Sequence, residues 1–140
     1  MPSSAATPTG SERVAGEPIL VVEDNAAQLK LLSALLEDAG YAVRIAPDAN
    51  EALLVLKTFR PRLILMDIQL PGIDGLTLTR MLKSNPSQRD IIIVGVTAYA
   101  MPEDEDRVRA AGCDGYLSKP IDTRALPDVV ASYLHPVVGP

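Results

Sequence analysis

The sequence predicts one α/β domain built on a doubly wound parallel sheet of five strands, with helices on both faces. Short apolar runs alternate five times with longer segments of helical periodicity between residues 18 and 134, an order typical of parallel sheets. Three of the runs are apolar throughout, as expected of strands that are buried on both faces. Charged or hydroxyl side chains follow four of the runs, at the end of the strand where such sheets bind ligands.

Length and composition are typical of a globular domain. The chain has 140 residues, of which 47% are hydrophobic and 22% charged. Its net charge of −5 argues against direct nucleic-acid binding, which requires clustered Lys and Arg. The single cysteine, Cys113, excludes an internal disulfide and fits a reducing compartment, where we expect it to be a small buried apolar residue. With no secretory signal and no membrane-spanning stretch, we expect a cytoplasmic protein without membrane contact.

The first half of the chain shows clear element boundaries. Residues 1–17 are rich in small and polar residues and are expected to form a flexible tail. A strand over 19–22 comes next, then a leucine-rich helix that Gly40 ends. Residues 41–45 alternate in the manner of a strand, and Asp48 begins the next helix as a capping pair with Glu51.

The second half repeats the pattern with stronger breaks, because proline and glycine separate its elements. Pro71-Gly72 predicts a turn, and the four acids at 103–106 suit the positive end of a helix. The expected elements are a strand over 63–66, a helix over 74–83, a strand over 91–96, a helix between Pro102 and Gly112, a short strand at 116–117, and a last helix capped by Asp122 and reaching Leu134.

The predicted strand ends bring three acids, a hydroxyl and an amine to one edge of the sheet. Glu23 and Asp24 follow the first strand, Asp67 the third, Thr97 the fourth and Lys119 the fifth. Crowded carboxylates repel one another, and a divalent cation such as Mg²⁺ relieves that repulsion by taking oxygen ligands. We therefore expect Asp24 and Asp67 to bind Mg²⁺ directly and Glu23 to act through a water.

Beside a metal ion, Asp67 would be a nucleophile able to accept a phosphoryl group as an acyl phosphate. Lys119 would neutralise the equatorial oxygens of the transition state, and Thr97 would donate a hydrogen bond to one of them. A lone acid at a strand end is usually only solvated. Because three other strand ends converge on the same edge of the sheet, we favour a functional role for Asp67 over a solvated acid.

These residues resemble the receiver domain of two-component response regulators. The segments that carry the resemblance are LVVEDN, LILMDIQLPGIDG, VGVTAYAM and GCDGYLSKPID. The resemblance covers residues 18–134 and implies a flavodoxin-like (βα)5 receiver fold with strand order 2-1-3-4-5. Residues 135–140 would be a C-terminal tail, in which His135 is expected to have no partner, and the protein would be a single-domain type without an output domain.

The resemblance also implies a role for each residue of the site. Asp67 would be the phosphoacceptor, Glu23 and Asp24 the acidic pair that holds Mg²⁺, and Gln69 the residue whose backbone carbonyl binds the metal. The phosphoryl donor would be a sensor histidine kinase or a histidine phosphotransfer protein. Apart from assisting its own phosphorylation and dephosphorylation, the protein would not be an enzyme.

The resemblance assigns Thr97 and Lys119 to phosphoryl binding. Lys119-Pro120 matches a peptide bond that is cis in the family, a conformation that the sequence permits but does not show. Tyr116 matches an aromatic residue that would turn inward when the hydroxyl of Thr97 moves toward phosphate. The surface formed by residues 102–134 would then bind a downstream protein. Tyr99 is expected to pack in a loop or an interface.

Three other classes of function remain as alternatives: a phosphatase, a module that binds a nucleotide cofactor, and an interaction module. A haloacid-dehalogenase-type phosphatase also uses a strand-end aspartate with Mg²⁺, but it requires a second acid two residues later, where this chain has Gln69. A flavin module would need a phosphate-binding loop, and a dinucleotide site a G-x-G-x-x-G motif, where this chain has Glu23-Asp24. The third alternative is a protein-interaction module that never receives phosphate.

Overall fold

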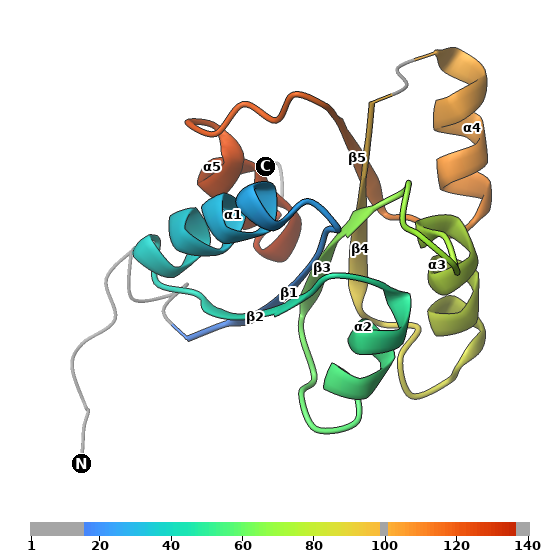
Figure 1. Cartoon of the computed structure of the whole chain (residues 1–140), viewed down its shortest axis with the longest axis horizontal. Helices are drawn as coiled ribbons and strands as arrows, with labels where there is room; N and C mark the ends of the chain where they lie inside the picture. Colours follow the sequence, from blue (N-terminus) through green and yellow to red (C-terminus); the bar gives the residue numbers. More distant parts are fainter. Residues whose placement is uncertain (1–15, 99–100, 137–140) are drawn as a thin grey trace.

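A computed structural model describes residues 16–98 and 101–136, which form a five-stranded parallel sheet between two layers of helices (Figure 1). The strands follow the order β2-β1-β3-β4-β5, so the predicted fold class and strand order are confirmed. The strands are β1 Pro18–Val22, β2 Ala42–Ala46, β3 Leu63–Asp67, β4 Ile92–Thr97 and β5 Gly115–Ser118. The helices are α1 Ala26–Asp38, α2 Ala49–Val55, α3 Gly75–Ser84, α4 Pro102–Ala110 and α5 Leu126–Leu134.

The three central strands are the three continuous apolar runs of the sequence. Every residue of β3 is buried, as are all but the first residue of β1 and of β4. The two edge strands, β2 and β5, are partly exposed. Burial on both faces therefore accounts for the absence of alternation in the central strands.

Side chains of the central strands point alternately into two hydrophobic layers. One layer packs against α1 and α5 and includes Ile19, Leu65 and Val96. The other packs against α2, α3 and α4 and includes Leu20 and Met66. Figure 1 shows α1 and α5 on one side of the sheet and the other three helices on the opposite side. The carboxyl ends of the strands are left at the rim between these layers.

Side-chain caps fix where three of the helices begin. The oxygens of Asn25, Asp48 and Asp74 accept hydrogen bonds from backbone N–H groups three residues later, at 2.9, 2.8 and 2.8 Å. The predicted cap at Asp48 is therefore confirmed. Because the caps at 25 and 74 lie just beyond β1 and β3, they hold the chain in place next to the ends of these strands.

The predicted start of the last helix is wrong. Asp122 does cap a turn, since its side chain accepts a hydrogen bond from Arg124 N–H at 3.1 Å, but α5 begins only at Leu126. The reason is Pro127 in the first turn of α5. Proline has no N–H to donate, so it is tolerated in the first turn of a helix but not in the interior of a longer one.

The expectation that His135 has no partner is also wrong. Its Nε2 lies 2.6 Å from Glu17 Oε1, so the ring N–H donates to the carboxylate, whose other oxygen pairs with Arg62. Glu17, which was expected to belong to the flexible tail, thus contacts the folded domain. The rest of the predicted N-terminal tail, Tyr99 and residues 137–140 lie outside the described ranges. No helix within those ranges has both the length and the apolar character that spanning a bilayer requires.

Helix α3 begins in direct contact with the backbone of the third strand. A Cβ atom placed on Gly75 would lie only 2.2 Å from the carbonyl oxygen of Asp67 and 2.9 Å from Ile68 Cα. Gly75 N–H also donates to the carbonyl of Ile68 at 3.0 Å, which closes the loop between β3 and α3. Glycine at position 75 is therefore a steric requirement of the end of β3.

We expect Gly75→Ala to lower the free energy of unfolding by about 1–3 kcal/mol, because the added methyl group must displace backbone atoms. Helix propensity alone would predict the opposite sign. Urea unfolding followed by circular dichroism measures the change, with Met81→Ala on the exposed side of the same helix as the control. Equal stability of the two variants would contradict the packing of α3 described above.

Glu17 joins the segment before β1, the start of β3 and the end of α5, and its side chain is only 12% exposed. Glu17→Gln removes the negative charge from the acceptor that Arg62 and His135 share, so the free energy of unfolding should fall by about 1–3 kcal/mol. Glu37→Gln, on the exposed surface of α1, should change it by less than about 0.5 kcal/mol. If both variants unfold at the same urea concentration, the Glu17 contacts contribute nothing to stability.

Candidate functional site

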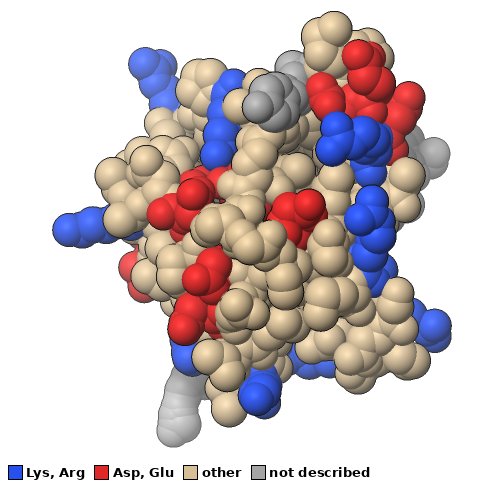
Figure 2. All heavy atoms as spheres, turned by 45° about the vertical axis from the view of Figure 1, so that its right-hand side comes forward, with Lys and Arg blue, Asp and Glu red and all other residues tan. Residues whose placement is uncertain are grey.

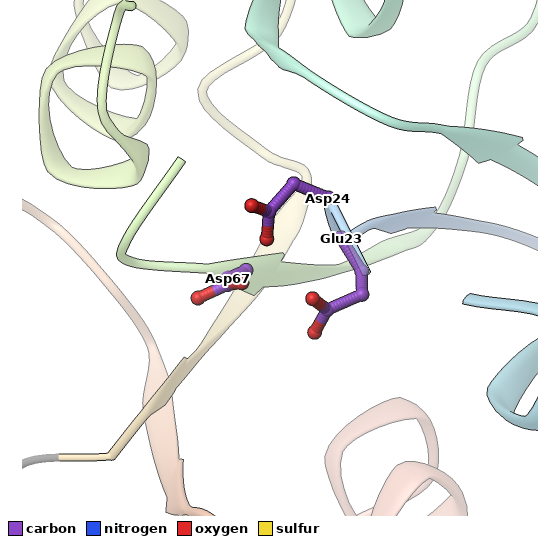
Figure 3. A group of neighbouring side chains, drawn as sticks. All are labelled: Glu23, Asp24 and Asp67. Atoms are coloured by element: carbon purple, nitrogen blue, oxygen red, sulfur yellow. The ribbon is translucent and has the colours of Figure 1, made fainter. Parts of the chain in front are cut away.

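Three carboxylates meet at the carboxyl ends of β1 and β3, as the sequence predicted. One oxygen from each of Glu23, Asp24 and Asp67 lies within 4.8 Å of the others (Figure 3). Glu23 and Asp67 are each 2% exposed, whereas Asp24 faces solvent. Two buried acids and one exposed acid at this separation form a set of hard oxygen donors that fits a small divalent cation.

Hydrogen bonds hold both carboxylate oxygens of Asp67. Its Oδ1 accepts the backbone N–H of Gln69 at 3.0 Å, and its Oδ2 accepts from Lys119 Nζ at 3.1 Å. Its side chain is therefore fixed in orientation, although Asp67 is the last residue of its strand. A carboxylate held in this way presents its remaining lone pairs in a defined direction.

The positive charge of Lys119 compensates the buried negative charges of Glu23 and Asp67. Besides bonding Asp67, its Nζ lies 3.4 Å from Glu23 Oε1. Burial by itself would lower the pKa of Lys119, but the hydrogen bond and charge of Asp67, with the charge of Glu23, outweigh burial and raise that pKa. The ammonium group is thus held in its charged form between the two buried acids.

Burial and neighbouring charges together shift the pKa of Glu23. Removal from solvent raises the pKa of Glu23, and the charge of Asp67 raises it further, while the backbone N–H of Asn25 and the charge of Lys119 lower it. That N–H donates to Glu23 Oε2 at 3.0 Å. This contact was not predicted from the sequence. The available signal was that Asn25, which caps α1, directly follows the acidic pair.

Thr97 and Lys119 reach the site from neighbouring strands. Thr97 is the last residue of β4 and is 2% exposed, and it pairs in register with Ser118 of β5. The backbone N–H of Lys119 donates to the carbonyl of Thr97 at 2.7 Å, so the two residues are tied together at the sheet edge. The peptide bond between Lys119 and Pro120 is cis, which the sequence had left open.

Tyr116 lies further from the edge of the sheet, on the face of β5 that packs against the layer that includes Val108 of α4. It pairs in register with Gly95 and is half-buried against the hydrophobic layer that includes α4. The structure therefore places this ring between the core and the surface, and its switching role stays a prediction. Cys113 is 6% exposed in the same layer, and burial raises the pKa of its thiol, so it is the buried apolar residue expected.

Two cavities give access to the carboxylates from opposite sides. One, of about 410 Å³, is bordered by Glu23 and Lys119 together with the start of α1. The other, of about 530 Å³, is bordered by Asp24, Gln69 and residues of the β3–α3 loop, with Arg107 of α4. Small anions and metal ions can therefore reach the edge of the sheet, although Asp67 itself is buried.

Comparisons with known proteins agree with this geometry. The family model for the response regulator receiver domain matches residues 19–131. The polar-differentiation response regulator DivK of Brucella anthropi is 43% identical over 116 residues, which cover 83% of this chain and 94% of that protein. The chemotaxis response regulator CheY4 of Vibrio cholerae has a similar structure, with a TM-score of 0.78, 27% identity, and coverage of 83% of this chain and 97% of that chain.

A third relative bears on the carboxylates. The receiver domain of a sensor histidine kinase from Pseudomonas aeruginosa, 32% identical with a TM-score of 0.77, holds a magnesium ion in its active-site cleft. That comparison covers 86% of this chain and 98% of the Pseudomonas chain. Because the family match extends over most of the described fold, the chain belongs to the response regulator receiver domains of two-component signalling.

Proposed function

We propose that this receiver domain accepts a phosphoryl group on Asp67 from a phosphohistidine of a sensor histidine kinase or a histidine phosphotransfer protein. The observation that supports the proposal best is the arrangement around Asp67. A buried carboxylate is held by Gln69 and Lys119, and two further acids lie within metal-binding distance. A merely structural acid would not need this combination of neighbours.

Mg²⁺ is the proposed cofactor. The residues that would hold it are Asp24, Asp67 and the backbone carbonyl of Gln69, with Glu23 acting through a water. The donor set fits, because its carboxylate oxygens lie within 4.8 Å of one another and two of the three acids are buried. When bound, the ion supplies positive charge that relieves repulsion among the acids and offsets negative charge on a phosphoryl group.

The proposed reaction uses residues whose positions are described above. An oxygen of Asp67 forms a bond to phosphorus while the bond from phosphorus to the donor imidazole nitrogen breaks, and that nitrogen keeps the electron pair. Lys119, already 3.1 Å from Asp67 Oδ2, would neutralise charge on the phosphoryl oxygens. Thr97 would donate its hydroxyl proton in a hydrogen bond to one of these oxygens.

We propose that the chain is a signalling protein and not an enzyme that turns over an external substrate. A phosphatase with a strand-end nucleophile would use an acid two residues later to protonate the leaving group. The side chain at that position is the amide of Gln69, which has no proton to give as an acid. Phosphoryl transfer would then stop at the acyl phosphate until water hydrolyses it.

We propose that phosphorylation changes the surface with which the protein binds a downstream partner. Phosphorylation adds charge and three acceptor oxygens beside Thr97. Movement of Thr97 toward them would make room for the half-buried ring of Tyr116 to turn inward. The surface over residues 102–134 would then repack and bind a downstream protein, as expected of a two-state element biased by a local charge.

Acetyl phosphate with Mg²⁺ should add one phosphoryl group to the protein, and Asp67→Asn should remain unmodified, because an amide oxygen is a poor nucleophile. Intact-mass spectrometry detects the adduct, and treatment with hydroxylamine should remove it, as expected of an acyl phosphate. Unfolding in urea checks that the variant keeps its fold. An equal mass gain in the variant would place the phosphoryl group elsewhere.

Asp24→Asn should weaken Mg²⁺ binding about tenfold or more, because it removes a charged ligand from the set. Isothermal titration calorimetry measures the dissociation constant. Asp38→Asn, which removes an exposed charge at the end of α1, is the matched control and should leave the constant almost unchanged. Identical affinities for both variants would exclude Asp24 as a ligand.

A further inference from the structure

The cavity of about 530 Å³ on the α4 side of the carboxylates has an uneven charge distribution. Its walls carry the carboxylates of Asp24 and Asp74, beside the amide of Gln69. The backbone N–H of Thr77 donates to Asp74 and lowers the pKa of that carboxyl, so it stays ionised. Among the described residues that border this cavity, Arg107 is the one that carries positive charge.

Arg107 is held only weakly in its present position. Its Nη1 lies 3.2 Å from Asp104 Oδ1 within α4, and 66% of its side chain is exposed. Exposed ion pairs of this kind contribute little and are screened by salt. The guanidinium group can therefore swing about its long side chain between Asp104 and the cavity without disturbing the core.

A small phosphoryl donor that approaches Asp67 from this side meets unfavourable charges. Such a donor carries about two negative charges. Bound Mg²⁺ offsets part of the charge of the three site carboxylates, but Asp74 on the cavity wall adds a further negative charge that repels the donor. The first turn of α4 adds Glu103, Asp104 and Glu105 to the same side of the molecule, and Figure 2 shows acidic side chains gathered over its upper right part. Lys119 is engaged by Asp67 and Glu23 and borders the other cavity.

We propose that Arg107 is a positioning residue that attracts dianionic acyl phosphates of low molecular weight into the Asp24 side of the site. The proposal rests on phosphorylation of Asp67 as described above. In the reaction, an Asp67 oxygen bonds to phosphorus while the bond from phosphorus to the donor's carboxylate oxygen breaks. The leaving carboxylate keeps the electron pair, and Arg107 acts before this step, by raising the local concentration of the donor.

The test is the initial rate at which acetyl phosphate modifies the protein at fixed Mg²⁺, measured by intact mass. At an ionic strength of about 10 mM, where charges act over about 30 Å, Arg107→Gln should react about three- to fivefold more slowly than the parent. At about 0.5 M salt the two rates should converge. Arg107→Lys keeps the charge and should restore most of the low-salt rate.

Arg109→Gln is the matched control. Arg109 lies on the same helix and pairs with Glu105 at 3.1 Å, but it is not among the described residues that border the cavity. Its replacement should lower the low-salt rate by less than the replacement of Arg107, because Arg109 is paired with Glu105 and lies outside the cavity.

The outcomes separate the two proposals. Equal low-salt rates for Arg107→Gln and the parent would overturn the role of Arg107. So would a loss that salt does not reduce and Arg107→Lys does not restore, since that pattern indicates packing and not charge. If the parent itself gains no phosphoryl group at any salt concentration, phosphorylation of Asp67 by this donor class is wrong, and the role of Arg107 is overturned with it.

Discussion

The ion pair between Lys119 and the buried acids is the interaction on which the site depends. Two carboxylates that are each 2% exposed would repel strongly if their charges were not compensated, and Lys119 lies 3.1 Å from one and 3.4 Å from the other. Each of the three residues comes from a different strand end, so the pair also fixes the relative positions of β1, β3 and β5. Fold and chemistry therefore share the same contacts.

Much of this arrangement was predictable because the fold relies on local signals. The central strands were evident from unbroken apolar runs, and the positions of Glu23, Asp67, Thr97 and Lys119 followed from where those runs stop. A parallel sheet gathers such strand ends at one edge whatever the lengths of the intervening helices. For this reason four short motifs, far apart in sequence, were enough to predict most of the site.

The features that sequence reasoning missed depend on contacts between distant segments. Nothing near His135 in the sequence indicates that Glu17 lies beside it, because only the finished fold brings the two ends of the domain together. The start of α5 was misplaced for a different reason, since the capping signal of Asp122 is real but Pro127 decides where the helix can continue. The backbone contact of Gly75 with Asp67 likewise follows from packing and not from pattern.

The closure of the β3–α3 loop has a consequence for how this region could vary. Because Gly75 N–H bonds to the carbonyl of Ile68, the segment 69–74 leaves and returns to nearly the same point, next to the nucleophile. Its tip at Pro71 and Gly72 is exposed. Residues added at this tip would extend the loop outward into solvent. The entropic cost would be small, because the entropy of loop closure grows slowly with loop length. Family members could thus differ in the length of this loop, and so in the shape they offer to a partner, while the reactive carboxylate keeps its place.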